Sequence, residues 1–208
     1  MLKIYGQKQS RAARCMWAME ELGLQYEQVV MAPRSAEARH PDYLALNPSG
    51  KIPTLVHDGF VLTETFAINF YLASQFPGSL LPSDPRAVAK VLQWTSWALS
   101  DLEPVVVSIL KEGRRPPEQI DAGRIEAARV EAQALVGAVL EPALAGGEYL
   151  LAGAGVGAAG FTLADLNVST VASLLPMFQI SLAAHPRTDA WLKRCLARPA
   201  YQRAQQKP

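Results

Sequence analysis

One stretch in the first third of the chain combines three features that can hold a peptide-like anion. Ile52-Pro53 is an X-Pro pair, and proline keeps the residue before it extended. Asp58-Gly59 separates two short apolar runs, which is a strong signal for a β-hairpin. Thr63-Glu64-Thr65 then opens a helix-like pattern, and the N-terminus of a helix attracts carboxylates.

A second group of polar side chains lies near the start of the chain. Ser10 begins a helical pattern that ends at Gly23, so its hydroxyl can cap the helix or donate a hydrogen bond to an anion there. Arg14 lies four residues on, on the same predicted face, and Arg11 is adjacent to Ser10. Tyr5 ends the preceding apolar run and is a rival donor.

The elements that position these groups alternate in type. Strands at 2–5 and 26–30 flank the helix at 10–23, which predicts a βαβ unit with parallel strands. A helical patch at 36–46, the hairpin and a helix at 64–76 complete a βαβ–ββα order. The stretch from Phe76 to Pro85 contains three prolines and a glycine and is predicted to be a linker.

Nearly everything after the linker is predicted to be helical. The expected helices cover 87–112 with a kink at Pro104, 118–141, 162–175 after the capping box Thr162–Asp165, 186–196 and 200–205. The glycine-rich loop 146–160 lacks the Lys-Ser/Thr of a phosphate-binding loop and is given no phosphate role. We therefore predict an α/β domain at 1–78, a linker at 79–85 and an all-helical domain at 86–208.

Composition limits the classes of function. The chain has 208 residues, half of them apolar, and a formal net charge of +1, which argues against a nucleic-acid partner. Cys15 and Cys195 lie far apart, which favours free thiols in a reducing compartment. We expect no signal peptide and no membrane span. We also expect no metal, because the three histidines show no metal-ligand spacing. These features predict a soluble cytoplasmic protein.

Four motifs in order give the chain a resemblance to the cytosolic glutathione transferases over almost its whole length. The motifs are Ser-Arg-Ala-Ala-Arg at 10–14 with Glu-Glu-Leu-Gly-Leu at 20–24, Leu-Asn-Pro-Ser-Gly-Lys-Ile-Pro-Thr-Leu at 46–55, Leu-Thr-Glu-Thr at 62–65 and Phe-Thr-Leu-Ala-Asp at 161–165. The resemblance implies a thioredoxin-like N-terminal domain, a C-terminal helical bundle domain and a homodimer.

The resemblance also implies how the tripeptide glutathione is held. It implies a cis bond at Pro53, with the N–H and C=O of Ile52 pairing with the cysteinyl backbone by strand addition. Thr65 would hold the γ-glutamyl carboxylate, and Glu64 would accept from the γ-glutamyl ammonium. The alternatives are a simple rigid turn at Pro53 and ordinary helix capping at residues 63–64.

Several basic or polar side chains are candidates for the remaining contacts. Lys51 and His40 can meet the glycyl carboxylate, with Arg39 as a competitor. Arg14 is a further candidate beside the glutathione. Gln7, Lys8 and Gln9 lie near the expected mouth of the site. Surface charges of this kind are also commonly just solvated.

The thiol-activating group has two candidates. A glutathione transferase needs the glutathione thiol as a thiolate, so a donor or a positive field must lower the pKa of that thiol. Some classes of the family use a tyrosine at the end of the first strand and others a serine or cysteine at the helix start. Ser10 is preferred over Tyr5, although in one alignment Gln9 occupies the family's serine position. Backbone groups or an arginine alone are the third possibility.

The function that follows is a glutathione transferase that conjugates the glutathione thiolate to small hydrophobic electrophiles, as in detoxification. The alternative is a non-catalytic binding or scaffold protein of the same fold. A glutathione-dependent reductase or peroxidase is disfavoured, because Cys15 lies inside the helix and has no Cys-x-x-Cys partner. The electrophile pocket is expected between the domains; its candidate lining residues are Trp97, Asp101, Val105, Ile109, Met177 and Phe178.

Overall fold

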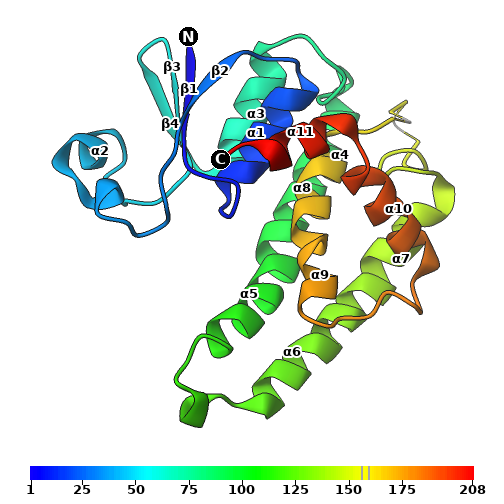
Figure 1. Cartoon of the computed structure of the whole chain (residues 1–208). Coiled ribbons are helices and arrows are strands. Elements are labelled where there is room, and N and C mark those ends of the chain that lie inside the picture. The colour runs from blue at the N-terminus through cyan, green and yellow to red at the C-terminus, as the bar shows by residue number, and fades with distance from the viewer. Residues whose placement is uncertain (156, 159) are drawn as a thin grey trace. The chain divides into compact units, whose positions relative to one another are not determined.

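Four short strands pair into one mixed sheet in the computed structural model, which describes every residue of the chain except 156 and 159 (Figure 1). The order across the sheet is β2 (Tyr26–Val29), β1 (Leu2–Tyr5), β3 (Thr54–His57) and β4 (Phe60–Thr63). β1 runs parallel to β2 and antiparallel to β3, and β3 and β4 form the predicted hairpin. The thioredoxin-like order of strands and helices is therefore confirmed.

Helices cover both faces of this sheet. α1 (Ala12–Glu21) and α3 (Thr65–Gln75) lie side by side on one face, and η1 (Glu37–Arg39) and α2 (Pro41–Leu46) lie on the other (Figure 1). Leu2 and Ile4 of β1 are buried, while Tyr5 packs against Tyr43 of α2. Alternate side chains of β1 therefore serve the two faces, as the pleat of a strand requires.

Two helices of this unit differ from their predicted bounds. The helix predicted at 10–23 begins only at Ala12, and Gly23 follows its end with the left-handed φ of 65° expected of a terminating glycine. The patch at 36–46 is broken at His40, which is extended with a ψ of 140°. Pro41 follows it, and a residue before proline is disfavoured in the helical region.

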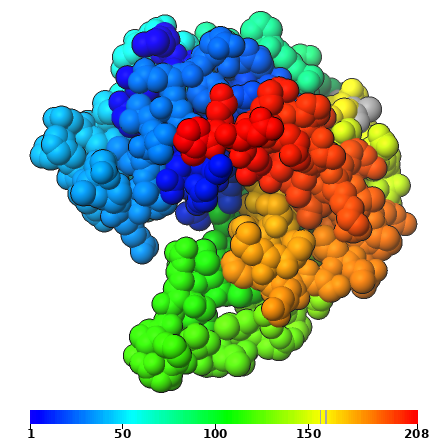
Figure 2. Space-filling model, viewed as in Figure 1, coloured from blue at the N-terminus to red at the C-terminus, as the bar shows by residue number. Residues whose placement is uncertain are grey.

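Contacts divide the chain into two compact units, Met1–Leu81 with Ala197–Pro208 and Pro82–Leu196. The sequence placed the last residues with the helical domain, whereas α11 (Pro199–Gln206) packs on α1. Arg198 forms two hydrogen bonds of 2.6 and 2.7 Å to the carboxylate of Glu21, and Tyr201 meets the Trp17 ring edge-on at 4.8 Å. The C-terminal residues, in red, accordingly lie on the N-terminal residues, in blue (Figure 2).

We expect acidification to loosen α11 from α1. Burial raises the pKa of Glu20, but hydrogen bonds from Arg203 and Tyr26 and the charge of Lys207 outweigh it, so the pKa of Glu20 is below its ordinary value of 4.5. Its stabilising contribution is complete above pH 4.5 and is lost as the pH falls through the lowered pKa. Hydrogen exchange of the α11 amides, measured against pH, should therefore accelerate in that acidic range.

Glu20→Gln is the matched variant for this prediction. It should show the faster exchange already at neutral pH, because it removes the charge that Arg203 and Lys207 face. An α11 that keeps its protection in both conditions would contradict the prediction.

In the second unit, Pro82–Leu196, every regular element among the described residues is a helix. Its elements are α4 (Pro85–Trp97), η2 (Ala98–Leu102), α5 (Glu103–Glu112), η3 (Pro117–Gln119), α6 (Ala122–Leu135), η4 (Val136–Leu140), α7 (Glu141–Ala143), η5 (Leu144–Gly146), α8 (Leu163–Ala172), α9 (Leu174–Met177) and α10 (Pro186–Leu196). The glycine-rich loop 146–160 contains both residues that lie outside the described part of the chain. Within the described residues, no helix combines the length and apolarity that crossing a membrane requires.

The long helices of this unit widen where a proline follows. The helix predicted at 87–112 is continuous, but residues 98–102 form a π-helical turn just before Pro104. The same arrangement recurs at residues 136–140, before Pro142. Proline lacks an N–H and its ring collides with the carbonyl one turn earlier, so a wider turn accommodates it.

The capping box predicted at the start of α8 is present. The Thr162 side chain accepts a hydrogen bond from the first turn, and Asp165 reaches back to the Thr162 N–H at 3.0 Å. Nearly all of α8 is buried, as its lack of a polar face indicated. It therefore forms the centre of the helical unit.

Candidate functional site

The register of the sheet brings the predicted site segments to one end. Tyr5 at the end of β1 pairs with Thr54 at the start of β3, and Thr54 pairs with Thr63 at the end of β4. Three segments therefore lie at the same end of the sheet: the loop that follows Tyr5, the Ile52-Pro53 turn and the first residues of α3. Strand pairing alone thus assembles Ser10, Ile52 and Thr65 from three separate parts of the chain.

Gly6 allows two of these segments to meet closely. Its φ is 142°, and a Cβ on it would overlap the Cβ of Ala12. The same position lies 3.6 Å from both the Ser10 Oγ and the Ile52 Cδ1. Only glycine suits this point, and the Ser10 hydroxyl and the Ile52 side chain both lie close to it.

Ser10 occupies the turn just before α1 rather than the first position of the helix. Its Oγ accepts a hydrogen bond from the Ala12 N–H at 3.2 Å and donates one to the Gln7 carbonyl at 2.7 Å. The hydroxyl thus adjoins the positive end of α1. Its proton is directed to Gln7, and a rotation about one bond releases it to another acceptor.

The peptide bond between Ile52 and Pro53 is cis, as the resemblance implied. Hydrogen bonds from two neighbouring side chains hold this turn in place. Tyr43 Oη and Asn47 Nδ2 both donate to the Lys51 carbonyl, at 2.5 and 2.8 Å. The same two side chains also hydrogen-bond the Thr54 hydroxyl. The sequence did not predict this support, because Tyr43 belongs to no motif and Asn47 appears only within the motif at 46–55.

The backbone of Ile52 is left without a hydrogen bond among the residues that the structure describes. Its side chain is partly buried against the cluster of Met31, Ala38 and Tyr43. Backbone N–H and C=O groups are nearly always paired in proteins. An unpaired donor and acceptor on a rigid turn, two residues before the start of β3, therefore offer a place for an added strand.

The N-terminus of α3 is equally open. Glu64 precedes it with a φ of 69° and a ψ of 119°, and no side chain caps the helix. Such a conformation costs a residue other than glycine on the order of 1–3 kcal/mol and is concentrated at functional sites. Thr65 is buried, yet its hydroxyl forms no hydrogen bond within the described chain. These groups can together receive a carboxylate.

Arg14 and Cys15, both on α1, contact the N-terminal residues of α3. The Arg14 guanidinium is buried and packs over the Phe66 ring at 5.7 Å, so its charge lies by the first turn of α3. Cys15 Sγ donates to the Thr65 carbonyl at 3.7 Å, and burial raises the pKa of this thiol well above its usual range. The thiol of Cys15 is thus protonated and enclosed, which agrees with its predicted inert role.

Among the basic candidates, Arg39 lies close to the turn that contains Gly50 and Lys51. The Arg39 Nη1 lies 3.6 Å from the position that a Cβ on Gly50 would take, and Lys51 is the next residue. Both side chains are exposed, and neither has an ion-pair partner among the described residues. His40 instead caps α2 by accepting from the Asp42 N–H at 3.3 Å.

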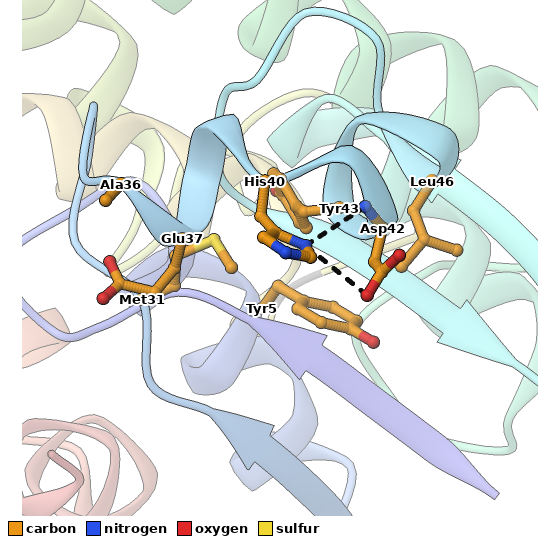
Figure 3. A pocket seen from close by; sticks show the side chains of 8 residues that line it. All are labelled: Tyr5, Met31, Ala36, Glu37, His40, Asp42, Tyr43 and Leu46. Carbon is orange, nitrogen blue, oxygen red and sulfur yellow. Dashed lines mark hydrogen bonds and ion pairs between the residues drawn. The ribbon is translucent and has the colours of Figure 1, made fainter.

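Tyr5 and His40 share a pocket on the α2 face of the sheet (Figure 3). Its volume is about 490 Å³, and its lining residues are Tyr5, Met31, Ala36, Glu37, His40, Asp42, Tyr43 and Leu46. The Tyr5 ring lies 5.4 Å from that of Tyr43. Ser10 is not part of this lining, so the two candidate thiol-activating groups face different surroundings.

The residues predicted to line an electrophile pocket have mixed environments within the helical unit. Ile109 is buried in its core, and Trp97 stacks edge-on against Trp94 at 5.5 Å. Asp101 and Met177 are exposed. Over the described residues, no group of three or more His, Cys, Asp or Glu side chains is arranged to hold a metal ion.

Comparison with known proteins gives a consistent picture. Residues 1–74 match the family model "Glutathione S-transferase, N-terminal domain". The chain is 34% identical to "Glutathione S-transferase 3" of Zea mays over 97% of this chain and 92% of that protein. It is 30% identical to "Glutathione S-transferase GstB" of Escherichia coli, over 96% of this chain and 95% of that protein.

Solved structures agree with the relatives. A theta class glutathione S-transferase from Xanthomonas axonopodis pv. citri, with glutathione bound, matches with a TM-score of 0.86 at 29% identity, over 100% of this chain and 98% of that one. A glutathione transferase from Burkholderia graminis, with two glutathione molecules bound per subunit, matches with a TM-score of 0.87 at 25% identity, over 100% and 88%.

Proposed function

The chain belongs to the glutathione S-transferase family, and on this premise we propose that it binds glutathione and conjugates its thiolate to small hydrophobic electrophiles. The observation that carries the proposal is the pairing of two open backbone sites at one end of the sheet. Ile52 offers an unpaired N–H and C=O, and α3 offers an uncapped N-terminus. A backbone donor–acceptor pair and a helix N-terminus at the same end of the sheet suit a short extended peptide with a carboxylate at one end.

Glutathione fits these sites in one direction. The cysteinyl backbone pairs with Ile52, and the γ-glutamyl carboxylate binds the N–H groups and hydroxyl at Thr65, next to the charge of Arg14. Glu64 is exposed and has no ion-pair partner among the described residues, so it is available to the γ-glutamyl ammonium. The glycyl carboxylate then points to Lys51 and Arg39. Each charged group of the tripeptide meets an opposite charge or a helix end.

Activation of the thiol is assigned to Ser10. Its Oγ–H turns from the Gln7 carbonyl to the sulfur of glutathione and stabilises the thiolate, while the thiol proton leaves to solvent. The positive end of α1 favours the same anion. The thiolate attacks the electrophile, a carbon–sulfur bond forms, and the leaving group departs with its electron pair. Holding both reactants side by side supplies the rest of the acceleration.

Retention on immobilised glutathione, followed by a conjugation assay with chlorodinitrobenzene, tests this proposal. We expect retention and glutathione-dependent conjugation. Lack of retention would refute the binding site. Retention without conjugation on a broad electrophile panel would favour a non-catalytic binding protein, a reading supported by the present donation of the Ser10 hydroxyl to Gln7. A reductase or peroxidase is disfavoured by the enclosed thiol of Cys15.

Arg39→Met is expected to weaken glutathione binding more than His40→Gln does. Removing the guanidinium beside Lys51 should raise the KM for glutathione about threefold to tenfold and leave kcat unchanged, because the contact is the same in ground and transition states. The effect should shrink in high salt, since both charges are exposed.

Arg34→Met is the control for this comparison, because Arg34 is also an exposed arginine of the same segment. It should leave KM unchanged. If the KM for glutathione rose only in His40→Gln, the contact with the glycyl carboxylate would be assigned to His40 instead.

We also propose a cytoplasmic homodimer, which rests on the family resemblance alone. Sedimentation velocity should give a mass twice that of the chain. A single-chain mass across the micromolar range would refute the dimer without touching the site.

A further inference from the structure

Gln28, on β2, joins three segments that are distant in the sequence. Its Nε2 donates to the Gly6 carbonyl at 3.0 Å and to the main-chain oxygen of Pro208 at 2.9 Å. The Lys8 N–H donates to the same Pro208 oxygen at 3.2 Å. One amide and one main-chain oxygen thus fix the loop immediately before Ser10 from both sides of Gln7.

Peptide planarity connects this arrangement to Ser10. The Lys8 N–H and the Gln7 C=O belong to one planar peptide group and point in opposite directions. The N–H faces Pro208, and the C=O accepts from both the N–H and the Oγ–H of Ser10, at 3.1 and 2.7 Å. Any tilt of this plane therefore moves the acceptor that holds the Ser10 hydroxyl.

The end of the chain is anchored well enough to serve as a support. Lys207 lies 3.4 Å from the Glu20 carboxylate and 4.9 Å above the Tyr26 ring. Arg203 binds Glu20, and Arg198 binds Glu21, so several contacts hold α11 against α1. The Pro208 oxygen is consequently fixed relative to the helix that Ser10 precedes.

We propose that Gln28 and the segment Lys207–Pro208 form a clamp that positions the Ser10 hydroxyl for thiol activation. Gln28 is a positioning residue: it is assigned no contact with glutathione and acts through the peptide between Gln7 and Lys8. The inference rests on the proposed function in assigning Ser10 to the thiol. The clamp itself is a property of the free protein and can be measured without glutathione.

The test compares Gln28→Ala and the isosteric Gln28→Glu, which lacks the Nε2 donor, with Gln25→Ala. Gln25 is an exposed glutamine just before β2 whose side chain forms no hydrogen bond among the described residues. In both Gln28 variants we expect faster hydrogen exchange at the Lys8 amide of the unliganded protein. We further expect a raised pKa for the thiol of bound glutathione and a kcat/KM about threefold to tenfold lower at neutral pH.

Binding of S-methylglutathione should be unchanged in these variants, because that ligand has no thiol and touches none of the clamp. A thiol pKa and a Lys8 exchange rate equal to those of Gln25→Ala would overturn the clamp. Parallel loss of S-methylglutathione affinity would overturn the positioning role in favour of general disruption. A thiol that titrates in the parent complex as it does in free glutathione would overturn the proposed activation, and Lys8 exchange would then decide the clamp alone.

Discussion

Ser10→Ala should raise the pKa of the thiol of bound glutathione by about one to two units and leave the affinity for S-methylglutathione unchanged. A hydrogen bond to a charged group contributes about 1.5–3 kcal/mol, and one pKa unit corresponds to about 1.4 kcal/mol. With a parent thiol pKa near 7, the thiolate fraction at neutral pH, and with it kcat/KM, should fall roughly fivefold to fiftyfold. The Gln7 carbonyl keeps its hydrogen bond from the backbone N–H of residue 10 after the change and loses only the one from the Ser10 Oγ–H.

The loss of kcat/KM in Ser10→Ala should depend on pH. The variant's deficit should be largest below the thiol pKa of its own complex and should shrink as the pH rises through that value, because the thiolate then forms without assistance. Ultraviolet absorbance of the thiolate in each complex measures the pKa directly, and the pH profile of kcat/KM checks it.

Tyr5→Phe is the control for Ser10→Ala, since it removes a hydroxyl that faces the pocket beside Tyr43. We expect its thiol pKa to match that of the parent protein. Loss of activation in Tyr5→Phe alone would reverse the assignment. Equal small losses in both variants would leave backbone groups and the α1 dipole as the source of activation.

Asp165→Ala should cause the largest loss of stability in the helical unit. The carboxylate is fully buried and accepts from the Leu150 N–H, the Thr162 N–H and hydroxyl, and the Trp191 Nε1–H, all at 2.9–3.1 Å. Burial raises the pKa of Asp165 on balance, and the hydrogen bonds from these four donors oppose that shift only in part. Truncation leaves all four donors facing a cavity.

The expected cost follows from these partners. An unsatisfied buried donor costs about 1–3 kcal/mol and loss of a helix cap about 1 kcal/mol, so a total of about 4 kcal/mol is expected after partial relaxation. For a chain of this size that corresponds to a Tm roughly 8–16 °C lower. Denaturant unfolding followed by circular dichroism measures the change.

Asp189→Ala provides the matched comparison. Asp189 lies on the surface of α10 and pairs with Lys193 one turn on, so its loss should cost about 0.5 kcal/mol or less. If Asp165→Ala destabilised the protein no more than this variant does, the capping box would not be the anchor between α8, the loop at Leu150 and α10.

The parts of the fold that the sequence predicted depend on local signals. Asp58-Gly59 takes positive φ at both residues, as a tight hairpin requires, and the register of β3 and β4 follows from that turn. The capping box between Thr162 and Asp165 spans three residues and was predicted from them alone. Each of these features is decided by neighbours in the chain.

The parts that the sequence did not predict depend on distant partners. The docking of α11 rests on Arg198 and Glu21, which lie 177 positions apart, and nothing local marks them as a pair. The π-helical turns before Pro104 and Pro142 appear in the sequence only as prolines, which predicted a kink. Propensity alone does not say how a buried helix absorbs a proline.

The candidate site divides in the same way. Ile52, Glu64 and Thr65 were predicted from their motifs, and the sheet register brings their segments to one edge. The positive φ of Glu64 and the proximity of Arg39 to Gly50 needed the structure. Gln28 gave no signal at all, because an isolated glutamine in a strand has no motif and its partners are Gly6 and Pro208.

The most direct test of the central claim is a pH titration of the thiolate absorbance of glutathione bound to the parent protein. We predict an apparent thiol pKa near 7 or below, about one to two units lower than that of an ordinary free thiol. A bound thiol that titrates with the pKa of free glutathione would contradict the claim that this site activates it.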